Sequence, residues 1–239
     1  MSTVGRSARP VLLLTGAAEG LGASIAGAFA AAGHDVVGLA RSSRSAAALA
    51  RRVGEGRGSY IHLACDITRP AALAGALQPH ADRVSVLVHN AHALLMKPFD
   101  ETTLAEFEHV WRVACFGAFA AIQAVLPAMI ARGRGTIILT GATAGIRGGA
   151  RFAAFASAKF ALRGMAQSLA RELGPRGVHV AHVVLDGLLD EAQTEGRFGP
   201  AQSARMDPDA VARAYLGLAT QHPSAWTHEL DLRPFSERF

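Results

Sequence analysis

Three glycines, Gly16, Gly20 and Gly22, follow directly on an apolar run near the start of the chain, and this pattern constrains the fold more than any other feature. The run Leu12-Leu13-Leu14 is typical of a buried strand, and residues Ala23 to Ala32 have the character of a helix. In a strand–turn–helix unit, the first glycine permits a tight turn, the second lets a pyrophosphate approach the backbone, and the third lets the helix pack closely on the strand. The helix N-terminus offers unpaired N–H groups to an anion. The pattern predicts a nucleotide-binding turn; a turn that is only tight is the alternative.

Short apolar runs of strand character alternate along the chain with longer, alanine-rich segments of helical period. This alternation predicts an α/β fold with a parallel sheet covered by helices on both faces. The runs are Val11 to Thr15, Asp35 to Ala40, Tyr60 to Cys65, Val84 to His89, Thr136 to Thr140, Val178 to Leu185 and, near the end, Thr227 to Leu232.

Two helix starts carry clear signals. Thr103 and Glu106 have the spacing of a capping box, and Asp207 precedes Pro208 at a first helical position. Residues Ser42 to Ala50 fit a surface helix. Because no linker, repeat or low-complexity tract divides the chain, we expect residues 1–239 to form one domain.

Composition excludes several classes of protein. Half of the 239 residues are hydrophobic, which is enough for a substantial core and excludes a disordered or fibrous chain. The net charge is +5, but the arginines are scattered, so we expect small anionic ligands and no nucleic-acid partner. The stretch Met1 to Pro10 is short and polar, and we expect a cytoplasmic protein with neither signal peptide nor membrane-spanning segment. Cys65 and Cys115 lie in apolar surroundings and are expected to be buried thiols.

The glycine turn, Thr15-Gly16-Ala17-Ala18-Glu19-Gly20-Leu21-Gly22, resembles that of the short-chain dehydrogenase/reductase family, and four later motifs extend the resemblance over nearly the whole chain. These are Cys65-Asp66-Ile67-Thr68, His89-Asn90-Ala91-His92, Phe155-Ala156-Ser157-Ala158-Lys159 and Asp186-Gly187-Leu188-Leu189. The resemblance implies a doubly wound Rossmann domain, an NAD(P)H-dependent oxidoreductase that acts on a small molecule, and a dimer or tetramer formed through long helices at Val110 to Ile130 and Phe152 to Leu173. The implied cofactor contacts come from Gly16, Glu19, Gly20, Leu21, Gly22, Arg41, Ser42, Asp66, Ile67, Asn90, Ala91, Lys159, Gly187 and Leu189.

The end of the second strand favours NADPH over NADH. A carboxylate there would bind the ribose hydroxyls of NAD and repel the additional phosphate of NADP. Here the residues are Arg41 and Ser42, and a guanidinium is a permanently charged, forked donor for phosphate. Glu19, where relatives that prefer NADP often carry a base, argues the other way, and use of both cofactors stays open.

The resemblance also indicates that the catalytic centre has changed. The family's proton-donating Tyr corresponds to Phe155, while the Lys four residues later is retained as Lys159. The family's Ser corresponds to Ala142, and its Asn on the long central helix to Ala114. A phenyl ring has no proton to give, and losing one positioned acid typically costs about a hundredfold to ten-thousandfold in rate.

Hydride transfer itself belongs to the cofactor, so reduction can persist where the substrate stabilises its own developing charge. We therefore expect an oxidoreductase that reduces an activated carbonyl, enone, quinone or imine. The alternative is a non-catalytic dinucleotide-binding scaffold or redox sensor, and a lyase or isomerase on the same fold is a third interpretation.

Other polar groups near these motifs are candidates for the missing acid. Thr143, beside Ala142, carries a hydroxyl, as does Thr140. His92 has a ring suited to proton transfer near neutrality, or else is satisfied by nearby backbone. His89 is expected to bond a neighbouring loop, and neither histidine has a spacing that indicates a metal site.

Two features of the sequence concern the substrate. Arg147 and Arg151 either bind an acidic substrate or are solvated. Residues 187–207 correspond to the family's substrate loop, and where the family has a Thr that contacts the nicotinamide this chain reads Leu189-Asp190-Glu191-Ala192.

Overall fold

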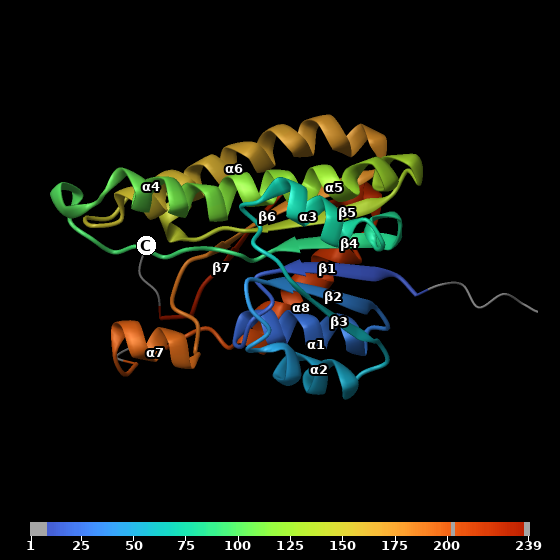
Figure 1. Cartoon of the computed structure of the whole chain (residues 1–239), viewed down its shortest axis with the longest axis horizontal. Coiled ribbons are helices and arrows are strands. Elements are labelled where there is room, and N and C mark those ends of the chain that lie inside the picture. The colour runs from blue at the N-terminus through green and yellow to red at the C-terminus, as the bar shows by residue number, and fades with distance from the viewer. Residues whose placement is uncertain (1–8, 202–203, 237–239) are drawn as a thin grey trace, which may run out of the picture.

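The computed structural model describes residues 9–201 and 204–236, and within them the chain forms one seven-stranded parallel sheet (Figure 1). The strand order β3-β2-β1-β4-β5-β6-β7 reverses direction between β1 and β4, as in a doubly wound sheet. The strands are β1 (Val11–Thr15), β2 (Asp35–Ala40), β3 (Tyr60–Ala64), β4 (Val84–His89), β5 (Gly135–Thr140), β6 (Val178–Leu185) and β7 (Glu229–Leu232). The predicted single α/β domain is confirmed.

Helices cover both faces of the sheet, and each face has its own hydrophobic core. On one face lie α1 (Leu21–Ala31), α2 (Ala46–Gly54) and α8 (Pro208–Ala219); on the other lie α3 (Pro70–Leu77), α5 (Gly117–Ala131) and α6 (Ala153–Leu173) (Figure 1). The first core contains Phe29 and Tyr215, and the second contains Ile122 and Leu162, all four of them buried. Every residue of β1 and β6 is buried, because side chains on both sides of these strands face a helical layer.

Local capping signals predicted two helix starts correctly. The side chain of Thr103 accepts a hydrogen bond from the backbone N–H of Glu106 at the start of α4 (Leu104–Trp111), and Glu106 completes the capping box. The Asp207 side chain accepts from the N–H of Asp209 at the start of α8.

Other predicted boundaries shifted. The predicted helix Ser42 to Ala50 begins only at Ala46, because residues 42–45 form the loop that leaves β2. The predicted helix Val110 to Ile130 is instead a composite of α4, a π-helical turn at Arg112–Phe116 and α5.

One helical stretch of the described residues, Leu104–Ala131, is long and apolar enough to cross a membrane by length and composition alone. Residues 113–131 carry no charged side chain, so the chain does contain an uncharged run about as long as a membrane span. In the fold, half of its most apolar window is buried, and α5 packs on β4 and β5 through residues such as Ile122 and Met129. Packing on the sheet therefore accounts for the apolar composition of this helix.

Candidate active site

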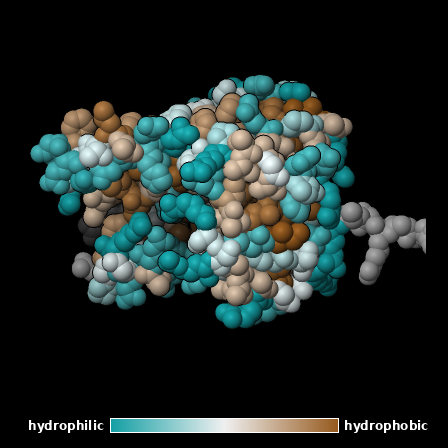
Figure 2. Space-filling model, viewed as in Figure 1, coloured by the Kyte–Doolittle hydropathy of each residue, from teal (hydrophilic) through white to brown (hydrophobic). Residues whose placement is uncertain are grey.

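A cavity of about 1050 Å³ lies at the carboxyl ends of the strands, where the sheet order reverses. This is where open α/β sheets bind their ligands. Figure 2 shows the surface hollowed between the lobe that carries α4 and the lobe that carries α7 (Ala192–Phe198). Of the residues predicted to contact the cofactor or to act in catalysis, all except Gly20 line this cavity, so the fold brings the separate motifs together.

The glycine turn brings backbone segments together more closely than a side chain would allow. Gly16 has a φ of +73°, and a Cβ at this position would lie 2.7 Å from the backbone nitrogen of Ala91. A Cβ at Gly22 would lie 2.7 Å from the carbonyl oxygen of Gly16, so glycine there lets α1 pack directly on the turn. The Asn90 side chain donates to the same carbonyl oxygen at 3.4 Å and ties the ends of β1 and β4 together. The backbone thus provides a cradle for an anion at the N-terminus of α1, and this fits a dinucleotide.

Two guanidinium groups line the cavity beyond the end of β2. Arg41 and Ser42 were predicted here, whereas Arg44 was missed, although it follows Arg41 in the same polar loop. Two hydrogen bonds connect this loop to β3. His62 donates from Nε2 to the carbonyl oxygen of Ser42 at 3.1 Å, and the Tyr60 hydroxyl donates to Nδ1 of His62 at 2.9 Å. The site therefore presents paired positive charges on a supported loop.

Asp66 lies beside this basic loop at the end of β3. One of its carboxylate oxygens accepts hydrogen bonds from the backbone N–H and the hydroxyl of Thr68, at 2.9 and 2.8 Å. These bonds, with the nearby guanidinium groups of Arg69 and Arg41, hold the pKa of Asp66 below its usual value. Next to it, Ile67 is buried against Gly117 of α5. The loop thus places a charged oxygen and an apolar surface together beside the basic loop.

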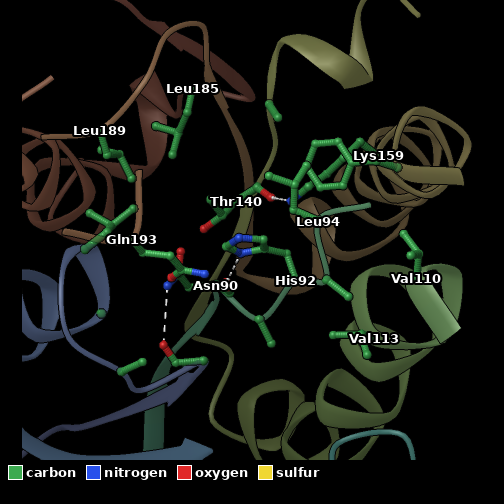
Figure 3. A pocket seen from close by; sticks show the side chains of 18 of the residues that line it. Asn90, His92, Leu94, Val110, Val113, Thr140, Lys159, Leu185, Leu189 and Gln193 are labelled. Atoms are coloured by element: carbon green, nitrogen blue, oxygen red, sulfur yellow. Dashed lines mark hydrogen bonds between the residues drawn. The ribbon is translucent and has the colours of Figure 1, made fainter. Parts of the chain in front are cut away.

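Lys159 is the buried cation of the site. Only 2% of the residue is exposed, and its ammonium donates to the backbone carbonyl oxygen of Thr140 at 2.7 Å (Figure 3). Phe155 lies four residues earlier on α6, with its ring centroid 5.6 Å from Lys159 Nζ. Burial lowers the pKa of Lys159 to about 8. The pair thus combines an ammonium of reduced pKa with a ring that has no hydroxyl.

The neighbouring hydroxyls are engaged elsewhere. Thr143 donates to a carboxylate oxygen of Asp186 at 2.6 Å, so its one proton is not free for a substrate in this arrangement. Thr140 Oγ1 accepts from the hydroxyl of Tyr215 at 3.0 Å. Ala142 lines the cavity and Ala114 is completely buried beside Phe155. Near Phe155, the proton of Thr143 is therefore already donated, and Thr140 is buried and bonded to Tyr215.

Two histidines lie at the end of β4. His89 is buried and shares a hydrogen bond of 2.9 Å with the hydroxyl of Thr15, and burial lowers its pKa to about 3. His92 stands among the cavity walls (Figure 3). Its ring lies edge-on to that of Phe155, with 6.4 Å between the two centroids. Its Nδ1 donates to the carbonyl oxygen of Asn90 at 3.3 Å. Its pKa is lowered by the surrounding protein and by the charge of Lys159, so the ring is neutral near pH 7.

Two walls enclose the substrate end of the cavity. One is apolar, and the other is formed by the substrate loop. Leu94, Val110 and Val113 form the apolar wall, opposite Leu189 and Gln193 (Figure 3). Residues 187–201 and 204–207 of the predicted substrate loop include α7, and the loop's two ends are joined by backbone hydrogen bonds from Asp190 and Met206.

The two arginine candidates differ. Arg147 lines the cavity, whereas Arg151 is outside its lining. Arg151 adopts a φ of +70°, and its carbonyl oxygen accepts a hydrogen bond from the N–H of Lys97.

Comparison with known proteins identifies the family. Residues 10–196 match the family described as short chain dehydrogenase. The chain belongs to this family. This short-chain dehydrogenase is 31% identical to D-threitol dehydrogenase from Mycolicibacterium smegmatis over 222 residues. The alignment covers 88% of this chain and 85% of that protein. The chain is also similar to the crystal structure of a short-chain dehydrogenase from Rhodopseudomonas palustris (37% identity, TM-score 0.80, 95% of this chain and 99% of that one). A metagenomic short-chain oxidoreductase in complex with NADP has 30% identity and a TM-score of 0.82 over 95% of this chain and 98% of that one. These relatives are oxidoreductases, which places this chain among them.

Proposed function

We propose that this short-chain dehydrogenase prefers NADPH and reduces a small molecule whose acceptor group is an activated carbonyl, enone, quinone or imine. The observation that carries the proposal is the pairing of Lys159 with Phe155 in a cavity that is also lined by the glycine turn. The bound nicotinamide would supply the hydride. Lys159 would hold the nicotinamide ribose, and the structure offers no Tyr-type acid beside it.

The substrate class follows from the missing acid. A simple ketone becomes an alkoxide when it receives a hydride, and it needs a proton in the transition state. Enones, quinones and iminium groups spread or neutralise that charge themselves. His92 is neutral near pH 7 and holds its Nδ1 proton against Asn90, so it fits a hydrogen-bonding or proton-accepting role better than that of an acid. The proton would then come from solvent that reaches the cavity.

The direct test compares binding with turnover. Purified protein is titrated with NADPH and with NADH by nicotinamide fluorescence, and NADPH consumption is then measured with a quinone, an activated enone and an unactivated ketone. We expect NADPH to bind more tightly, and consumption with the first two acceptors but not the ketone. Tight binding without consumption of any acceptor would instead support a dinucleotide-binding scaffold, and failure to bind either dinucleotide would contradict both functions.

The preference for NADPH should depend on the basic loop. Replacing Arg41 and Arg44 together by alanine removes two charged donors from the adenosine end, and each charge-assisted bond to a phosphate contributes about 1.5–3 kcal/mol. Loss of one such bond lowers affinity by about 10–100-fold, so we expect NADPH affinity to fall by at least this much while NADH affinity changes only a few-fold. Arg51→Ala, which removes an exposed guanidinium of α2 outside the cavity, is the matched control. Equal losses for both dinucleotides would contradict the assignment.

We also propose that the protein forms a homodimer or homotetramer through α4, α5 and α6. Leu104, Phe107 and Trp111 share one face of α4, and Phe119 of α5 and Phe160 of α6 are exposed as well, at 45% and 44%. Exposed apolar groups of this size are typical of interfaces. We expect Phe119→Glu to reduce the mass measured by light scattering during gel filtration, whereas Phe235→Glu, at an exposed residue beyond β7, should not. A monomeric wild-type protein would refute this proposal.

A further inference from the structure

A carboxylate of the protein itself lies on the glycine turn. Glu191 Oε2 accepts a hydrogen bond from the backbone N–H of Leu21 at 3.2 Å. A Cβ built at Gly20 would lie 1.9 Å from the same oxygen, so the carboxylate rests against the backbone where the turn has no side chain. Gly20 is the one predicted cofactor residue outside the cavity lining, and Glu191 covers it.

The position of this carboxylate coincides with the place expected for the pyrophosphate. Leu21 is the first residue of α1, and its N–H is one of the donors that a helix start leaves without a partner inside the helix. No acidic residue lies in the first turn of α1 itself, so Glu191 is brought to this positive helix end from 170 residues away in the sequence. Two anions cannot occupy one set of donors, because like charges brought together repel strongly.

The carboxylate is delivered by an ordered part of the substrate loop. Glu191 is the N-cap of α7, where its carbonyl oxygen accepts from the N–H groups of Thr194 and Glu195 at 3.0 and 3.1 Å. The preceding residue, Asp190, donates from its backbone to the carbonyl oxygen of Met206 at 2.9 Å. The same residue therefore begins the loop helix and touches the cofactor turn.

We infer that Glu191 is an internal competitor of the dinucleotide, which sets the affinity of the site and must leave the turn when the pyrophosphate binds. The inference rests on the proposed dinucleotide-binding function. When a ligand binds only after a competing contact is broken, its apparent affinity is the intrinsic affinity multiplied by the fraction of molecules in the open arrangement. Release of the Glu191 side chain also couples occupation of the turn to the start of α7, which forms one wall of the substrate end.

The test is a dinucleotide titration of the full chain carrying Glu191→Gln, which removes the charge and keeps the size of the side chain. We expect its dissociation constant for NADPH to fall by about tenfold or more, and that of Glu191→Ala to fall at least as far. Adenosine 2′-monophosphate, measured by calorimetry, carries no group for the pyrophosphate position, and its affinity should stay unchanged. Glu195→Gln removes the same charge from an exposed position on α7 and should bind NADPH as the wild type does.

The outcomes separate this inference from the proposed function. If both Glu191 variants bind NADPH with unchanged or weaker affinity, the inference is overturned while dinucleotide binding stands. If Glu195→Gln tightens binding as much as Glu191→Gln, a general effect of net charge explains the result and the inference is also overturned. If no variant and no wild-type protein binds NADPH, both the inference and the proposed function are overturned.

Discussion

Substituting Lys159 by alanine is expected to lower NADPH consumption with a quinone or an activated enone by about a hundredfold or more. Lys159 is buried, hydrogen-bonded to the carbonyl oxygen of Thr140, and is the one ammonium in the lining of the cavity as the structure describes it. Its removal would take away both a positive charge and a group that fixes the reacting ring, and misplacement of a bound reactant by about 1 Å can cost about a hundredfold in rate. The measurement is the loss of nicotinamide absorbance under saturating NADPH.

The chain offers a matched control for this substitution. It contains two lysines, and the other, Lys97, is paired with Glu106 at 3.0 Å outside the cavity lining. Lys97→Ala should retain consumption within a few-fold of the wild type. The wild-type rate should also fall as the pH rises through about 8, because Lys159 loses its proton there. Two results together would show that Lys159 takes no part in the mechanism. These are a Lys159→Ala variant that turns over at the wild-type rate and a wild-type rate that does not fall as the pH passes through about 8.

Introducing hydroxyls at Phe155 and Ala142 should raise the rate of reduction of unactivated ketones by about 10²–10⁴ over that of the wild type. This is the usual contribution of a positioned acid. Phe155→Tyr with Ala142→Ser places both hydroxyls on residues that line the cavity, next to Lys159. The ammonium would lower the pKa of the new phenol, because a nearby positive charge favours the phenolate. Ala114→Asn is added in a third step, since Ala114 is completely buried and a polar side chain there must find partners.

Phe152→Tyr is the control for this gain. Phe152 also lines the cavity, with its ring centroid 6.5 Å from that of Phe155, so the substitution adds the same hydroxyl at a displaced position. Ketone reduction by the restored variants alone would show that the scaffold still aligns hydride and acid. Equal activity in Phe152→Tyr would mean that the position of the added hydroxyl does not affect the rate of ketone reduction. No activity in any variant, with NADPH binding intact, would show that the substrate end has changed beyond these positions.

The glycine turn shows how much the local sequence predicted. Gly16 and Gly22 were assigned their roles from spacing alone, and the structure gives each a backbone contact that a Cβ would block. The strand bounds of β1, β2, β4 and β6 also agree with the apolar runs. These features could be predicted because a run of buried strand residues and a glycine turn are decided by neighbours in the chain.

Thr143, Arg44 and Glu191 show what the sequence did not reveal. The hydroxyl of Thr143 was a candidate acid, but Asp186, 43 residues away, takes its proton. Arg44 joins Arg41 because the loop after β2 lines the cavity with both residues. Nothing in the spacing around Glu191 indicates that its carboxylate reaches the start of α1.

The sequence by itself thus determined the α/β fold and the family, since propensity, periodicity and residue identity are properties of the chain. Only the tertiary structure decided which polar groups are free and which are already engaged. Hydrogen bonds such as Thr143 to Asp186 and Leu21 to Glu191 join residues far apart in the sequence. Their formation requires the ends of β5 and β6, and the start of α1 and the substrate loop, to come within a hydrogen-bond distance of about 3 Å, which no local pattern encodes.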